Sequence, residues 1–377
     1  GVWATTERHP AVAGNSTREI AGVRTATVMA TPESDRKGVL LAIVEEVFHV
    51  SWLARHPGFR PDEMARYGYP LEDAANWTGL LAEDEALARA LDAKTEAEAA
   101  GWAAAVLEIR RRRVPKVSPE VRAYETALEM MEGTANYVAR RAADEGPQTT
   151  AARLRTERQA EGIRWRFYDT GAALCWILDR LAPDWKARSE ASPAVTTVEI
   201  LEGALKKRSA QPAKFSRKET AEFDSRAGIA VGELAERRAG LKRELMRRAG
   251  PRVVIEVPEG MEPFRPERFD PVNLFVLGGG EVVHPHFVTV RGPGGSVALT
   301  NPGFSRGSYS GTVAVTTSAG QDPMRDGFRR LTLTGVQGPL EVTREGQIVL
   351  KAAGLLIELQ QADIQTDGET VRIRVTG

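Results

Sequence analysis

The chain has 377 residues, more than one hydrophobic core usually organises, so two or three domains are expected. Its composition, 42% hydrophobic and 27% charged, excludes a collagen, a disordered tail and a membrane bundle. Lys plus Arg and Asp plus Glu both number 51, so no net charge favours nucleic acid as a partner. The single cysteine, Cys175, excludes an internal disulfide and a zinc site of several thiolates. It lies in an apolar run, which predicts a small buried hydrophobe.

The N-terminal region predicts a strand, a turn and a helix. Residues 21–30 alternate β-branched and smaller residues, as a half-buried strand does, and a polar break follows. The apolar run 38–50 contains Glu45, Glu46 and His49 and is too short to span a bilayer, so it predicts a buried helix. No signal segment of charged then apolar residues precedes it.

The middle of the chain is rich in strong helix formers. Helical sequence is predicted for four stretches, at residues 80–114, 121–143, 158–181 and 197–205. A last long helix over 214–249 carries dense alternating charge, which is typical of a solvated or bridging helix rather than a binding face.

The composition changes at Gly250 and Pro251. Short β-rich runs follow, among them 252–257, 273–278, 281–290, 296–300 and 370–375, separated by Gly, Pro, Asn and Asp. We therefore expect an α+β protein, with a mostly helical domain over 1–249 and an all-β sandwich or roll over 250–377. Glycines 278–280 are not followed by a helix, so they predict a turn rather than a phosphate loop.

The apolar helix carries the first candidate site. Glu45 and His49 are one turn apart on one face, and Glu46 lies beside them. In the zinc-protease pattern H-E-x-x-H, two histidines at this spacing bind zinc and the intervening glutamate is the general base. Here the first histidine is replaced by Glu45.

A second segment, Glu132-Gly133-Thr134-Ala135-Asn136-Tyr137, places a glutamate before small residues that would let another helix approach closely. The two segments together resemble the gluzincin-like bacterial metallopeptidases, in which a helix bearing H-E-x-x-H is followed by one bearing E-G-x-A-x-Y. Further similar segments are FHVSWLARHP (48–57), YPLEDA (69–74), the stretch 166–186 and FDPVNLFVLG (269–278).

The resemblance covers most of the chain and implies a zincin-like helical domain from an exported, extracytoplasmic branch of that family. It implies Glu132 as the third metal ligand, beside Glu45 and His49. A set of two carboxylates and one histidine still forms an open three-ligand site for Zn, but it shifts the preference toward Mn, Fe or Ca and acidifies a bound water less. Without a metal, at least one of the crowded carboxyls should be protonated or paired with an arginine.

Other patterns have simpler interpretations. The pair Glu46 and His49 also suits a structural contact, and a di-iron bundle would need a second E-x-x-H. Tyr168 could supply an oxyanion-stabilising phenol or pack as a core tyrosine. His284 and His286 are expected on the same side of one strand, where no third ligand is near, so an ordinary strand pair is favoured.

Two functions remain open at this stage. The first is metal-dependent hydrolysis of peptide bonds, with Glu46 as base and Tyr168 or an arginine supporting the oxyanion. The second is a catalytically inactive descendant that binds a peptide or a cell-envelope partner. The sequence does not identify the metal, the substrate or the oligomeric state.

Overall fold

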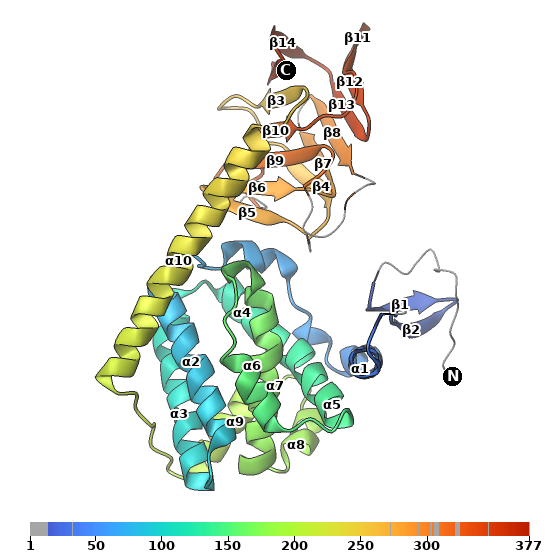
Figure 1. Ribbon diagram of the computed structural model, residues 1–377. Helices are drawn as coiled ribbons and strands as arrows, with labels where there is room; N and C mark the ends of the chain where they lie inside the picture. Colours follow the sequence, from blue (N-terminus) through green and yellow to red (C-terminus); the bar gives the residue numbers. More distant parts are fainter. Residues whose placement is uncertain are drawn as a thin grey trace. The chain divides into compact units, whose positions relative to one another are not determined.

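The computed structural model describes residues 14–31, 33–271, 273–292, 294–301, 304, 309–320, 325–345 and 347–376. Helices fill the N-terminal part and sheets the C-terminal part, which confirms the expected α+β class (Figure 1). The chain divides into two compact units: a helical unit, Gly1–Asp62 with Tyr69–Val231, and a β unit, Glu63–Gly68 with Gly232–Gly377. The sequence placed a boundary at residue 250, whereas this division falls inside helix α10 (Arg217–Met246).

The helical unit is built from helices that follow one another closely along the chain. They are α1 (Arg36–Arg55), α2 (Ala74–Asp92), α3 (Glu96–Arg113), α4 (Pro119–Leu128), α5 (Thr134–Ala142), α6 (Pro147–Leu154), α7 (Ile163–Leu181), α8 (Trp185–Ala191) and α9 (Thr197–Lys207). Short 3-10 turns are η1 (Pro57–Phe59), η2 (Glu63–Gly68, in the β unit), η3 (Val114–Lys116) and η5 (Ala160–Gly162).

The stretch 21–30, expected as one strand, is part of a hairpin. Strands β1 (Ser16–Ile20) and β2 (Val23–Thr27) pair antiparallel around a two-residue turn. The turn residues Ala21 and Gly22 have φ of 50° and 77°, the left-handed values that a tight hairpin of this kind requires. The local alternation predicted β structure correctly but gave no sign of a turn at Ala21.

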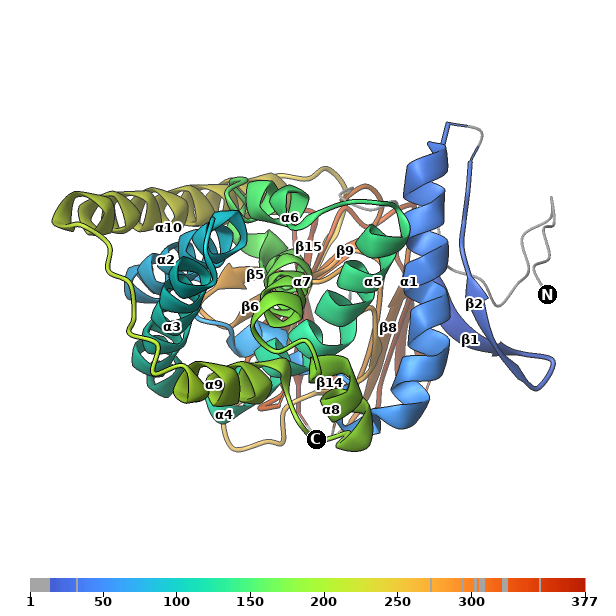
Figure 2. The ribbon, with the colours of Figure 1, turned by 90° about the horizontal axis from the view of Figure 1, so that it is seen from below.

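Helix α1 lies between α5 and the β1–β2 hairpin (Figure 2). It starts where the Asp35 side chain accepts a hydrogen bond from the Gly38 amide at 2.8 Å. The expectation of a buried helix is wrong: of its side chains, those of His49 and Trp52 are buried. Among the described residues, no helix is both long and apolar enough to cross a bilayer.

The residues predicted as one helix over 121–143 form α4, a π-helical turn η4 (Glu129–Gly133) and α5. The π-turn contains Glu132, and such wide turns occur frequently at functional sites. In an uninterrupted α-helix, Glu125, Glu129 and Glu132 would share one face. The wider turn rotates Glu132 away from the face of the other two glutamates. Glu125 and Glu129 bind arginines of α3, whereas the Glu132 side chain reaches His49 on α1.

Helices α7 and η4 cross at two glycines. A Cβ atom on Gly133 would lie 2.5 Å from the Cα atom of Gly171, and one on Gly171 would lie 2.5 Å from the carbonyl oxygen of Glu129. The predicted close approach at Gly133 is therefore confirmed, and α7 is the helix that approaches. Cys175, further along α7, is buried as expected.

A buried network of ion pairs joins α2, α3, η4 and α7. Arg110 on α3 contacts Glu83 on α2 at 2.7 Å and Glu129 at 2.6 Å. The hydroxyl of Thr170 on α7 also donates to Glu129, at 2.6 Å. The carboxylate of Glu129 thus has partners on two helices, and these contacts fix the π-turn that carries Glu132. The sequence analysis did not identify this network.

The β unit contains two sheets that share one hydrophobic core, so it is a sandwich. The first has the order β14-β15-β3-β10-β9-β6-β5 and the second β11-β12-β13-β8-β7-β4. Neighbours are antiparallel except β15 and β3, which are parallel. The strands are β3 (Arg252–Glu256), β4 (Arg265–Phe269), β5 (Phe275–Gly278), β6 (Glu281–His284), β7 (Phe287–Gly292), β8 (Gly295–Thr300), β9 (Val313–Ser318), β10 (Phe328–Thr334), β11 (Glu341–Glu345), β12 (Gln347–Ala352), β13 (Leu355–Leu359), β14 (Ala362–Asp367) and β15 (Thr370–Val375).

The run 281–290 is two strands rather than one. Strand β6 belongs to the first sheet and β7 to the second, and the chain passes from one to the other at Pro285. His284 is fully buried and bonds to the Thr316 hydroxyl at 3.0 Å, while His286 contacts Asp270 at 2.6 Å. The two histidines therefore do not share one face of a strand. Glycines 278–280 form the predicted turn between β5 and β6, all with positive φ.

Candidate functional site

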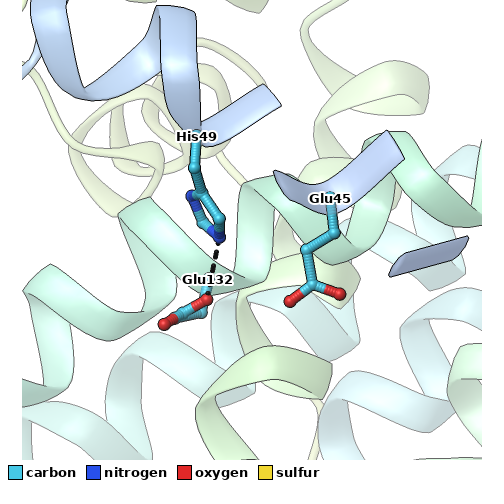
Figure 3. A group of neighbouring side chains, drawn as sticks. All are labelled: Glu45, His49 and Glu132. Carbon is cyan, nitrogen blue, oxygen red and sulfur yellow. Dashed lines mark hydrogen bonds and ion pairs between the residues drawn. The ribbon is translucent and has the colours of Figure 1, made fainter. Parts of the chain in front are cut away.

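The three predicted metal ligands converge in the helical unit. One ligand atom each from Glu45, His49 and Glu132 lies within 4.8 Å of the others, so the group could hold a metal ion (Figure 3). Glu45 and His49 come from successive turns of α1, and Glu132 comes from the π-turn. Two ligand atoms of one zinc ion lie at most about 4.2 Å apart, because each is ~2.1 Å from the ion. A small closure of the side chains would bring this group to that geometry.

The Glu132 carboxylate is the centre of the group's hydrogen bonds. One oxygen lies 3.1 Å from His49 Nε2, the dashed contact in Figure 3, and the other accepts from Arg164 on α7 at 2.8 Å. His49 Nδ1 is buried and has no hydrogen-bond partner among the described residues. The donors around Glu132 hold its carboxylate between α1 and α7.

The charges of the group shift its protonation. Burial, and then the charge of Glu132, raise the pKa of Glu45 to about 7. Burial disfavours the charged form of His49, but the hydrogen bond and charge of Glu132 outweigh it and raise the pKa of His49. Burial acts against an ionised Glu132 too, yet His49 and Arg164 keep the pKa of Glu132 below its usual value. The contact between His49 and Glu132 thus favours the protonated imidazole and the ionised carboxylate, while the pKa of Glu45, raised to about 7, favours a protonated Glu45.

Glu46 and Tyr168 lie beside the group without belonging to it. Glu46 is partly exposed on α1. Burial raises its pKa, the charge of Glu132 adds to this effect, and His49 opposes it. The backbone oxygen of Glu46 accepts a hydrogen bond from Thr17 in the β1–β2 hairpin at 3.3 Å.

Burial and the charge of Glu132 raise the pKa of Tyr168 well above its usual range, so the phenol keeps its proton. Arg164 donates a hydrogen bond to the Tyr168 oxygen, which leaves that proton free for another acceptor.

The sequence analysis did not identify Arg164 individually. It expected an arginine or a proton to compensate the carboxyls: Arg164 pairs with Glu132, and the raised pKa of Glu45 favours its protonated form. A signal for Arg164 did exist, since Arg164 and Tyr168 are one turn apart on α7. Which of the many arginines reaches Glu132 depends on how α7 packs.

The remaining motif positions around Glu132 hold helices together. The Asn136 amide donates to the backbone oxygen of Tyr168 at 3.0 Å, and the Tyr137 hydroxyl donates to Asp179 at 2.6 Å. Both partners are on α7, as is Gly171, which Gly133 touches. In this chain, therefore, E-G-x-A-x-Y supplies one candidate ligand and three contacts that fix the position of α7.

Comparison with known proteins adds no relative. No family model, no curated protein and no solved structure matches this chain. The resemblance to gluzincins therefore stays a prediction that rests on the motif residues. What the structure itself provides is a group of two carboxylates and one histidine, with His49 and Glu132 buried and Glu45 partly buried, that could hold a metal ion.

Proposed function

We propose that this protein is a metal-dependent hydrolase that acts on peptide bonds. The observation that carries the proposal is the convergence of Glu45, His49 and Glu132 from two elements far apart in sequence. Glu46 adjoins this group on α1, at the position of the base in H-E-x-x-H. The donor set suits Zn, and its two carboxylates also suit Mn or Fe.

The residues have distinct roles in this proposal. A bound divalent ion would polarise the substrate carbonyl and acidify a water molecule. Glu46 takes the proton from the attacking water, and its raised pKa brings it closer to the working range of a general base. Arg164 positions the Tyr168 phenol, whose O–H donates a hydrogen bond to the developing oxyanion.

One observation favours the alternative of a non-catalytic protein that binds a peptide or a cell-envelope partner. Arg164 forms an ion pair with Glu132 and His49 lies within hydrogen-bond distance of it, so protein groups already satisfy that carboxylate without an ion. An ion would have to replace the contact between His49 and Glu132 and compete with Arg164 for that carboxylate. A site in this condition can persist as a structural element.

The experiment that separates the two functions begins with elemental analysis of protein purified without chelator. Zinc binding is then measured by calorimetry on the wild type and on Glu45→His, which we expect to bind zinc at least about tenfold more tightly, because imidazole replaces a carboxylate. Glu202→His, an exposed position on α9, is the control for an added histidine. Peptide cleavage is measured on the same proteins and on Glu46→Gln.

Each outcome has a definite meaning. Cleavage that Glu46→Gln abolishes while metal binding persists supports the hydrolase. Tight zinc binding by Glu45→His without cleavage in any form favours the binding protein. Zinc binding that is no tighter in Glu45→His than in the wild type means that Glu45 is not at a ligand position.

A further inference from the structure

A second site is suggested in the β unit by a cavity of about 190 Å³ between the outer face of the first sheet and the end of α10. Its lining comes from five neighbouring strands, β15, β3, β10, β9 and β6, and from Lys242 and Met246 on the helix. The volume is below the range of roughly 300 to 1,000 Å³ that is usual for drug-sized ligands, so the cavity suits a small group. No lining residue belongs to the metal-ligand group, so the inference does not depend on the proposed function.

Strand pairing aligns the lining side chains on one face of the sheet. Arg372, Val254 and Thr332 are direct neighbours across β15, β3 and β10. Their chain neighbours Val253 and Leu331 point the other way and belong to the core of the sandwich. The backbone ladder therefore fixes the spacing of the groups that form the floor of the cavity.

The lining carries more positive than negative charge. It contains four cationic side chains and the carboxylate of Glu281. Lys242 pairs with Glu281 at 2.5 Å, so this acid is already compensated by the lysine. The cations that remain are Arg252, Arg330 and Arg372, one from each of three adjacent strands. No acid of the lining balances them.

These three arginines have N–H groups to offer. The Arg372 side chain forms no ion pair or hydrogen bond with any described residue. The Arg330 guanidinium lies 3.7 Å from Glu256, and both side chains are about half exposed, so this pair is weak. Arg252 donates one N–H group to the backbone oxygen of Met246, which holds its guanidinium at the end of α10, and its other N–H groups remain.

A buried hydroxyl adds a neutral donor. Thr332 is only 6% exposed, yet its hydroxyl has no hydrogen-bond partner among the described residues. A buried polar group without a partner is costly, and an oxygen atom in the cavity would satisfy it. Thr317 and Thr370 bring two more hydroxyls to the lining.

From these features we infer that the cavity binds a phosphate group, either as the free ion or on a small phosphomonoester. Guanidinium groups bind phosphate oxygens through paired N–H groups, and Arg252, Arg330 and Arg372 supply them from three sides. The Thr332 hydroxyl donates to a further oxygen. A carboxylate, with two oxygens and one charge, would leave part of this donor set unused.

Calorimetry on the full chain tests the inference with inorganic phosphate, in the presence of chelator so that no metal ion contributes to phosphate binding. We expect saturable binding of phosphate, and binding of acetate that is at least about tenfold weaker, because acetate offers fewer charge-assisted contacts. Glycerol phosphate then identifies the source of the group. Tighter binding than that of inorganic phosphate indicates a phosphomonoester, and equal or weaker binding indicates the free ion.

Arg372→Gln should weaken phosphate binding at least about tenfold, because it removes one charge-assisted contact. Arg374→Gln is the matched control: this arginine is exposed on the same face of β15 but does not line the cavity, so the affinity should stay within about twofold of the wild type. Neither arginine forms an ion pair with a described residue, so both variants should keep the circular dichroism spectrum of the wild type.

Thr332→Val tests the buried hydroxyl, because it keeps a β-branched side chain and removes the donor. We expect it to weaken phosphate binding several-fold. The inference is overturned if phosphate shows no saturable binding, if acetate binds as tightly as phosphate, or if Arg372→Gln weakens binding no more than Arg374→Gln does.

Discussion

Glu45 occupies the position at which the zinc-peptidase pattern has a histidine, and this changes the charge of the group when no ion is bound. The Glu45 and Glu132 carboxylates are close enough to repel each other, and burial adds to the cost of ionising both. The pKa of Glu45, raised to about 7, reports this cost. An ion would reverse it, because metal ligands must lose their protons.

The stability of the metal-free protein should therefore depend on Glu45. A folded-state pKa above the unfolded value contributes stability at low pH, and this contribution is lost as the pH rises through about 7. Glu45→Gln cannot ionise, so above pH 8 it should exceed the wild type by about 2 kcal/mol in unfolding free energy. Below about pH 4.5 the two proteins should agree.

Urea unfolding at several pH values in the presence of chelator measures this difference. Added zinc should reverse the order, because the ion stabilises the wild type more than a variant that lacks one ligand. A Glu45→Gln difference that is the same at pH 4 and pH 8 would contradict the assignment of the raised pKa to Glu45.

The ligand residues could be predicted from the sequence, whereas their surroundings could not. Glu45 and His49 follow from helical spacing, and Glu132 from the second motif, because both signals are local. Arg164 and the charge compensation of Glu132 depend on the packing of α7, which local sequence does not determine. The exposed face of α1 was missed for the same reason: apolar residues alone do not reveal whether another element covers a helix.

At the level of elements, the crossing of η4 and α7 fixes the position of the π-turn, and with it the point at which Glu132 contacts His49. Gly133 and Gly171 bring the two backbones into direct contact, with no side chain between them. Glu129, one turn before Gly133, is bound by Arg110 and Thr170. Backbone contact and buried ion pairs together leave the π-turn little freedom to move.

Gly133→Ala should therefore destabilise the helical unit by at least about 3 kcal/mol, because its Cβ would lie 2.5 Å from the Cα of Gly171 and neither backbone can yield. The unfolding free energy by urea denaturation measures this. Gly228→Ala on α10 is the control: no atom lies within 4 Å of its added Cβ, so helix propensity should stabilise the protein by up to about 1 kcal/mol. Equal effects of the two substitutions would contradict the role given to the crossing.

Most strands of the β unit could be predicted from the sequence, and the two that were missed there have a common cause. Strands β4 (RPERF) and β14 (ADIQTD) are each the outermost strand of their sheet. Edge strands carry charged residues and proline, which protect the edge from pairing with other chains. The same residues lower the β-propensity of the sequence, so the strand is harder to recognise. The break at Pro285 was missed because the apolar pattern continues on both sides of it.

Across the whole molecule, α10 belongs to both units. Its later part packs on the first sheet, where Leu245 is fully buried in a cluster with Val283, Val313 and Val315. The helical unit ends at Val231, in the middle of α10. The compositional change at Gly250 marks the end of the helix and not the edge of the β unit.

A fragment that starts at residue 232 should accordingly be more stable than one that starts at residue 250. The shorter fragment loses Leu245 and exposes the valines beneath it, at a cost of about 3 kcal/mol or more. Thermal unfolding of both fragments measures the difference, with the full chain as reference. If the fragments melt at the same temperature, the later part of α10 does not belong to the β unit.

The parallel pairing of β15 with β3 has a consequence for the order of events during synthesis. Strand β15 is made after the other described strands of the β unit but lies inside the first sheet, between β14 and β3. The early segment Glu63–Gly68 belongs to the same unit, and Met64 and Tyr67 pack on its core. About 300 residues separate residue 68 from residue 370, which the ribosome needs roughly 15 to 60 s to translate at ~5–20 residues per second. During that time Met64 and Tyr67 have no finished core to join, so the nascent chain carries them exposed while its helices already fold.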